Sequence, residues 1–451
     1  MKRILILIYC ICPMLLSGQN ILSTLEDMHS VGKGETWESI AASHGVSVVD
    51  LRAANPDVKK KKLKKGTLLI VPKAQLSNSS STKNTSEQRP SPLRINPDGT
   101  VSLIRTSISD LEVGVLLPLA DKRMLEFYRG LLMAADRVRK KGVNLDIHAW
   151  DSGTTTAKIE PLLAKVGKLD ILFGPAIATQ VPMVAETCRE KGVRLVLPFF
   201  YGQPLENYPL VYNATAPSTV LFEAAAQKLM SYFADKNFVI VRSGNAAGKG
   251  KNLSEAITKA LTKRTGAPRT LELEGDDFAY ESALNQFRDN MIVLDDSKVS
   301  SLKALLSHLK EFRAKHPQYR LSLLGFDDWQ DEINNFLNDF FALDTYIISP
   351  YYYNEWDDKV RNFEKAYTES FHMPVAQNNP RLAALGFDLG CYFLGGLSAF
   401  GNTFEKMQGD IQQEPYQNRF RFERGASAQS FSNNFVQFVH FTPENKIELV
   451  R

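Results

Sequence analysis

Residues 112–119 read EVGVLLPL, and this stretch decides the fold of most of the chain. It is a short apolar run, and residues 127–136 after it carry helical periodicity. The same order then repeats, with strands expected at 143–150, 169–175 and 193–198 and helices at 159–166 and 181–191. Apolar strands that alternate with helices are typical of a parallel sheet covered on both faces. The sequence therefore predicts a doubly wound α/β fold.

A second series of the same kind follows in the chain. After a helix expected at 219–234, apolar strands are expected at 238–242, 291–294 and 320–325. Two such series indicate two doubly wound lobes, which together occupy residues 111–451.

This region resembles the type I periplasmic solute-binding proteins, the group that contains the branched-chain amino-acid receptors. The motifs that carry the resemblance are VGVLLP at 113–118, Gly174-Pro175, Leu197-Pro198, LGFD at 324–327 and GFD at 386–388. The resemblance covers nearly all of the region and implies a binding protein whose lobes close on a ligand by hinge motion. It also implies three chain crossings between the lobes, expected near Tyr232, near Ser349-Pro350 and between Gly401 and Gln417.

The resemblance places a ligand cleft between the lobes, where loops follow the carboxyl ends of the strands. The candidate cleft residues are Asp151, Ala178, Thr179, Phe199, Tyr201, Ser243, Asn245, Asp327 and Tyr351. Each could equally be an ordinary loop residue. Amino-acid receptors use a hydroxyl group near the place of Ala178, so a free amino acid fits poorly here. Phe199, Tyr201 and the aromatic run at 351–356 are expected to fill the cleft or stack on a ring, although part of that run fits the core.

Residues 28–73 form a separate small module. Thr36 is a good N-cap for a helix that carries Trp37, a second helix ends at Asn55-Pro56, and short apolar strands bracket the pair. With the GET turn at 34–36 and the GTLLIVP ending at 66–72, this βααβ unit closely resembles a LysM domain.

The LysM resemblance implies binding to the N-acetylglucosamine-containing glycan of peptidoglycan or chitin. The glycan groove would be lined by Gly34, Glu35, Thr36, Trp37, Asn55, Pro56, Asp57 and Val58. Trp37 stands where the family usually has leucine, so it fits a place in the core as well. A single shallow groove binds weakly, and it would act by raising the local concentration of what it tethers.

The N-terminus has the build of a secretory signal peptide, expected at residues 1–18. Lys2 and Arg3 precede an apolar run at 4–16, and Gln19 stands where a lipoprotein would carry its lipidated cysteine. No transmembrane segment is expected after its removal, which predicts a protein of the periplasm or cell envelope. Residues 74–110 are rich in Ser, Asn, Thr and Pro and are expected to form a flexible linker.

Composition and motifs argue against nucleic-acid binding and catalysis. The 451 residues include 54 Lys+Arg and 50 Asp+Glu, a net charge of +4 that is too slight for a nucleic-acid-binding face. The seven histidines show no metal-binding spacing, and neither a GxSxG elbow nor the motif set of penicillin-recognising enzymes is present. We therefore expect no catalytic residue, metal or cofactor. Whether Cys188 and Cys391 form a disulfide or are buried separately stays open.

The sequence leaves two functions open. The first is a non-catalytic envelope protein that binds peptidoglycan through the LysM module and presents the two-lobed domain for a small ligand. The second is an envelope scaffold or regulator whose two-lobed domain docks a protein partner, such as cell-wall or secretion machinery.

Overall fold

The computed structural model describes residues 28–44, 48–53, 55, 58, 63, 65, 67–71, 93–95, 101–103, 109–215, 217–264, 266–424 and 430–450. The expected signal peptide and most of the expected linker lie outside these residues. Within the linker, β3 (Leu93–Ile95) pairs antiparallel with β4 (Val101–Leu103). The chain divides into two compact units, residues 1–90 and 91–451.

The small unit has the predicted strand-helix-helix-strand order. Strand β1 (Met28–Ser30) pairs antiparallel with β2 (Leu68–Ile70), and helices α2 (Trp37–Ser43) and α3 (Val48–Ala53) lie between them in the chain. Thr36 begins α2 as predicted, because its side chain accepts a hydrogen bond from the Ser39 amide and the Ser39 hydroxyl accepts one from the Thr36 amide. Buried side chains from both helices and β2 form the core: Trp37, Ile40, Ala41, Leu51 and Leu69.

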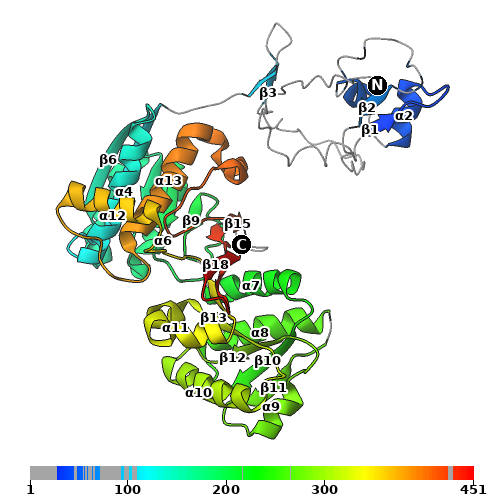
Figure 1. The fold of residues 1–451 in the computed structure, drawn as a ribbon. Coiled ribbons are helices and arrows are strands. Elements are labelled where there is room, and N and C mark those ends of the chain that lie inside the picture. Colours follow the sequence, from blue (N-terminus) through cyan, green and yellow to red (C-terminus); the bar gives the residue numbers. More distant parts are fainter. Residues whose placement is uncertain are drawn as a thin grey trace, which may run out of the picture. The chain divides into compact units, whose positions relative to one another are not determined.

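The described residues of the first lobe form a seven-stranded sheet with the order β15-β16-β9-β8-β7-β5-β6 (Figure 1). Its strands are β5 (Asp110–Leu117), β6 (Asn144–Asp151), β7 (Ile171–Phe173), β8 (Arg194–Leu197), β9 (Val211–Asn213), β15 (Phe422–Arg424) and β16 (Phe431–Asn433). Strand β15 runs antiparallel to β16, and the other neighbours run parallel. The stretch that decides the fold is therefore the buried strand β5, with β6 and β7 on its two sides.

The second lobe repeats this plan with the order β11-β10-β12-β13-β14-β17-β18. Its strands are β10 (Asn237–Arg242), β11 (Arg269–Glu272), β12 (Asn290–Leu294), β13 (Leu321–Phe326), β14 (Thr345–Ser349), β17 (Gln437–Phe441) and β18 (Ile447–Val450). Strands β10 to β14 pair parallel, whereas β17 pairs antiparallel with both β14 and β18. The predicted two-lobed α/β fold is confirmed.

Helices cover both sheets. In the first lobe they are α4 (Lys122–Arg139), α5 (Thr156–Ile159), α6 (Val181–Lys191), α12 (Asp358–Phe371) and α13 (Leu382–Phe400), with 3-10 turns η1 (Glu160–Lys168), η2 (Ala178–Gln180), η4 (Gly401–Lys406) and η5 (Gln408–Asp410). In the second lobe they are α7 (Ser218–Tyr232), α8 (Gly248–Thr262), α9 (Asp277–Ala283), α10 (Val299–Lys315), η3 (Asp327–Glu332) and α11 (Ile333–Ala342). The expected helix at 159–166 is mostly the 3-10 turn η1.

Two of the three expected crossings lie elsewhere. The crossing between β14 and α12 is confirmed. The first crossing comes between β9 and α7 rather than near Tyr232, because Leu221 and Phe222 of α7 pack in the core of the second lobe. The third comes between β16 and β17, because β16 still pairs with β9 of the first lobe. The apolar pattern of a helix or strand does not indicate which of two sheets it joins, so the positions predicted for the first and third crossings are wrong.

Helices α4 and α13 pack so closely that glycine is required at their contact. A Cβ atom at Gly130 would lie 1.9 Å from the Ala383 carbonyl oxygen, and one at Gly386 would lie 2.0 Å from the Phe127 carbonyl oxygen. Residues 382–406, which include α13, are long and apolar enough to cross a membrane, the one such segment among the described residues. However, 72% of an apolar 18-residue window of that segment is buried inside the domain, so the core accounts for its apolar character.

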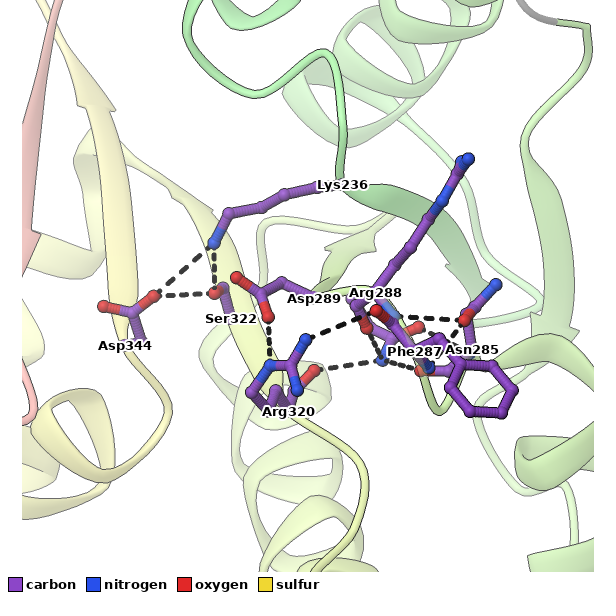
Figure 2. A network of polar contacts seen from close by, with 9 residues as sticks. Lys236, Asn285, Phe287, Arg288, Asp289, Arg320, Ser322 and Asp344 are labelled. Atoms are coloured by element: carbon purple, nitrogen blue, oxygen red, sulfur yellow. Dashed lines mark hydrogen bonds and ion pairs between the residues drawn. The ribbon is translucent and has the colours of Figure 1, made fainter.

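The buried Asn290 organises the amino ends of the second sheet, and Figure 2 shows the residues Asn285, Phe287 and Arg320 around it. The Asn290 side chain is fully buried, and its amide donates hydrogen bonds to the carbonyl oxygens of Asn285 and Arg320 at 2.9 and 3.0 Å. Its carbonyl oxygen accepts from the Asn285 amide at 2.7 Å and from the Asn237 side chain at 2.9 Å. The loop 285–289 is thereby fixed to β10, β12 and the start of β13, at the edge opposite the carboxyl ends of the strands.

Candidate functional site

The exposed turn of the small unit is held by one carboxylate. Gly34 has φ +91°, a conformation that favours glycine. The Glu35 carboxylate accepts a hydrogen bond from the Gly32 amide at 2.8 Å and contacts the His29 Nε2 atom at 2.7 Å. These two partners lower the pKa of Glu35, with the Gly32 amide contributing most. Gly34 and Thr36 are exposed beside it, which leaves the turn open to a ligand.

The other predicted groove residues divide into buried and surface positions. Trp37 is 2% exposed and packs in the core, with the Arg52 guanidinium 5.4 Å from its ring centre. Asn55 is also buried, and its side-chain amide donates to the Leu51 carbonyl oxygen at 2.7 Å. Val58 is half-buried, and Pro56 and Asp57 lie outside the described residues. The structure thus places Trp37 in the core, the alternative position that the sequence allowed.

In the first lobe, the predicted cleft residues differ in their roles. Asp151 organises the loops after β5 and β6, because its carboxylate accepts hydrogen bonds from the Leu119 and Gly153 amides at 3.0 and 3.1 Å. Ala178 and Thr179 are exposed on η2. Phe199 instead packs on the lobe core, edge-on to Phe127 at 5.2 Å between ring centres.

In the second lobe, the strand-end loops are held by acidic residues. Ser243 donates hydrogen bonds from its amide and its hydroxyl to Asp295 at 2.8 and 2.7 Å, and the exposed Asn245 donates its amide to the Ser243 hydroxyl at 3.2 Å. The Lys249 ammonium group bonds Asp327 at 2.7 Å and Asp328 at 2.5 Å. Burial raises the pKa of Asp327, and Lys249 opposes that shift.

The structure brings two predicted tyrosines near this charged group. Tyr201 of the first lobe is 70% exposed, and it lies close enough for the charges of Lys249 and Asp327 to act on its phenol. Tyr351 is buried on the second crossing, and burial together with the charge of Asp327 raises its pKa. Tyr201, Asp327 and Tyr351 therefore share one neighbourhood, whereas Phe199 belongs to the core.

Sequence reasoning missed several residues of this neighbourhood. Lys249, Asp295 and Asp328 are not among the predicted cleft residues. Their signal is their position, since each follows a parallel strand of the second lobe by no more than seven residues. Four of the cavities in the large unit are lined by none of the predicted cleft residues.

One group of three side chains in the described part of the chain could hold a metal ion. Glu112, Asp146 and His148 present ligand atoms within 4.8 Å of one another on β5 and β6. The His148 Nε2 atom lies 2.9 Å from Glu112 and 3.7 Å from Asp146, so the three already form a surface ion-pair group. Histidine spacing along the chain gave no sign of them, because strand pairing places Glu112 opposite Asp146.

The two cysteines are separate thiols. Cys188 on α6 is buried and Cys391 on α13 is half-buried, and neither forms a disulfide. Burial raises the pKa of each thiol to about 12, which makes both poor nucleophiles at neutral pH.

Comparison with known proteins identifies the small unit. The family model described as LysM domain matches residues 29–72. Residues 29–72 form a LysM domain. A search of curated proteins returned no match.

The large unit has the fold of the type I periplasmic binding proteins. A branched-chain amino acid ABC transporter protein from Rhodospirillum rubrum is similar with a TM-score of 0.56 at 15% identity, over 76% of this chain and 100% of that chain. A branched-chain amino acid ligand-binding protein from Burkholderia xenovorans reaches a TM-score of 0.48 at 14% identity, over 76% and 94% of the two chains. Full-length LpoA from Haemophilus influenzae reaches 0.49 at 12% identity, over 77% and 60%. At 15% identity the likeness to the Rhodospirillum rubrum protein shows the fold alone.

Proposed function

We propose that this protein is a non-catalytic cell-envelope protein that binds peptidoglycan glycan through its LysM domain and presents the two-lobed domain for a small ligand. Peptidoglycan binding is supported by the LysM domain and its exposed 34–36 turn. Backbone groups of such a turn can pair with acetamido groups, and the Glu35 contacts hold the turn in shape before a glycan arrives.

Sedimentation of the full chain with purified sacculi tests glycan binding. Gly34→Asn adds a side chain to the turn, where a Cβ atom meets nothing within 4 Å, and asparagine tolerates positive φ better than most residues. We expect a several-fold loss of sedimentation. Gly142→Asn is a matched control, because Gly142 has φ +90° and equally open space in the other unit. If the unaltered chain stays in the supernatant, the peptidoglycan proposal is wrong. If the unaltered chain sediments with the sacculi and Gly34→Asn sediments equally well, the glycan groove lies elsewhere.

The proposal that the two-lobed domain binds a small ligand rests on Tyr201 and on the ion pair of Lys249 and Asp327 near it. A ring that is 70% exposed beside Lys249 and Asp327 is placed to contact a ligand between the lobes. A bound ligand stabilises the folded domain by RT ln(1+[L]/Kd). When the members of a metabolite library are tested one at a time, at least one of them should therefore raise the Tm of the large unit.

A second candidate is an envelope scaffold or regulator whose large domain docks a protein partner. It is favoured by Phe287, which is 89% exposed on the fixed 285–289 loop, next to Arg288, whose side chain has no partner among the described residues. Exposed aromatic and arginine side chains dominate binding energy at protein interfaces. This candidate predicts no thermal shift with any metabolite and a stable partner in pull-down from envelope extracts that Phe287→Ala loses.

A further inference from the structure

A cavity of about 390 Å³ lies beside the second chain crossing, and none of the predicted cleft residues lines it. Its walls come from η3 and α11 of the second lobe, from residues 352–356 and from residues 377–381 before α13. Its volume is within the range of about 300–1,000 Å³ typical of small-molecule sites.

An aromatic platform stands in this cavity. Trp356 is 81% exposed, and its ring has no aromatic or cationic contact among the described residues. Its backbone is nevertheless fixed, because its amide donates to the Asn354 side chain at 3.1 Å and its carbonyl oxygen accepts from Arg361 at 2.6 Å. The indole is therefore presented in a defined place without being covered.

Polar side chains around the indole fall into two groups. Arg381, 9% exposed, bonds Gln377 at 2.5 Å and Glu355, and stacks over Tyr353 at 5.3 Å, so these residues bond one another and form a rigid wall. In contrast, the side chains of Asp331, Asn334 and Asn379 form no hydrogen bond or ion pair within the described residues, although they line the same cavity. These three are the groups available to a ligand.

We propose that this cavity binds a saccharide, with Trp356 against one face of a sugar ring and Asp331, Asn334 and Asn379 bonded to its hydroxyl groups. The C–H face of a pyranose ring packs on an indole, and hydroxyl groups donate to carboxylates and both donate to and accept from amides. An anion fits poorly, because Asp331 and Glu355 carry negative charge and the terminal nitrogens of Arg381 already donate to Asn378, Glu355 and Gln377. None of the residues that line this cavity is among the residues predicted for the LysM groove or for the strand-end cleft.

Iodide quenching of tryptophan fluorescence in the full chain tests the proposal. Trp37 and Trp329 are buried and Trp150 is half-buried, so Trp356 is the tryptophan that iodide reaches best. The probe is the neutral disaccharide of N-acetylglucosamine, a choice that rests on the proposed function, with maltose as a second saccharide. We expect saturating disaccharide to lower the quenching constant roughly twofold, because a pocket covers most of its ligand. Trp356→Phe should abolish this change.

Calorimetry of disaccharide binding to variants gives the second measurement. Each variant also carries Gly34→Asn, which weakens any binding of the disaccharide by the LysM domain. Trp356→Ala changes an exposed position and should fold, and Asn334→Ala should weaken binding about tenfold through a lost hydrogen bond. Asn338→Ala is the matched control, because Asn338 is exposed on the same helix α11 but does not line the cavity.

The proposal is overturned if neither saccharide protects Trp356 from iodide. Choline is tested in the same assay, and protection by choline alone would also overturn the proposal, because it would indicate an aromatic cation site. Protection by maltose without protection by the N-acetylglucosamine disaccharide keeps a saccharide site but removes an N-acetylglucosamine-containing glycan as its ligand. Sacculus sedimentation with no fluorescence protection would leave the LysM proposal intact and refute this one.

Discussion

Trp356 and Phe287 are the two most exposed large apolar side chains among the described residues, at 81% and 89%, yet their surroundings differ. Both stand on loops whose backbone is fixed by asparagine side chains. Trp356 lines a cavity with three unbonded polar side chains, whereas the polar groups that fix the Phe287 loop bond one another and leave a projecting ring (Figure 2). Phe287 lines none of the four cavities described above, and the difference teaches that an exposed ring indicates a small-molecule site where it lines a cavity together with unbonded polar groups.

The largest expected effect tests whether the Phe287 loop is as rigid as this comparison requires. Asn290→Ala would remove the side chain that bonds the amide and the carbonyl oxygen of the half-buried Asn285, while the Arg320 carbonyl oxygen keeps the residue 290 amide. We expect the unfolding free energy of the large unit to fall by about 3 kcal/mol, measured by urea titration. Asn245→Ala, at an exposed loop position, should change it by less than about 0.5 kcal/mol. A loss for Asn290→Ala as small as that of the control would mean that the loop is not fixed.

The corresponding change near Trp356 replaces Arg381, which holds together the rigid wall of the cavity. Arg381→Met would delete the hydrogen bonds to Asn378 and Gln377 and leave Glu355 without its cation. We expect about 2 kcal/mol lower unfolding free energy together with weaker protection of Trp356 by disaccharide. Arg123→Met, which breaks an exposed pair with Asp121, should cost at most about 1 kcal/mol. Full disaccharide protection in Arg381→Met would show that the wall does not shape the pocket.

A pH titration sharpens the comparison, because the segment behind the Arg381 wall is held by a buried acid. The Asp388 carboxylate accepts hydrogen bonds from the Tyr416, Gln417 and Asn418 amides at 2.7–2.9 Å, and the Gln417 side chain bonds the Arg381 backbone.

Burial raises the pKa of Asp388 to about 7, against the effect of those amides. The folded state then binds more protons than the unfolded state between about pH 4 and 7, so this group makes the unfolding free energy fall as pH rises through that window, on the order of 1 kcal/mol or more. Asp388→Asn should lack this slope in thermal melts across the range. Equal slopes would indicate that Asp388 titrates as it does in the unfolded chain.

The smallest expected effect is at Phe287 itself. Phe287→Ala should leave the unfolding free energy within about 0.5 kcal/mol and the saccharide affinity unchanged, because the ring packs on nothing in the described residues. Calorimetry with the disaccharide and thermal melts measure both. A clear loss of saccharide binding would break the comparison, since it would make the two rings parts of one site.

Sequence patterns predicted the LysM turn and both lobes because each pattern is local. The GET turn, the Thr36 cap and the apolar strands report on neighbours within a few residues. Phe199 shows where this fails: a loop position after a strand predicts a cleft residue, but packing against Phe127 decides that it lies in the core. The cavity at Trp356 could not be predicted, because residues near 331, 356 and 379 meet only after both lobes have formed.

By itself, the sequence determined that a LysM module precedes two α/β lobes, because apolar periodicity and capping residues fix local structure whatever the surroundings. Only the tertiary structure decided which sheet each helix covers, which aromatic rings stay exposed and which polar groups remain unbonded. Those properties depend on contacts between residues far apart in the chain, and no local pattern records them.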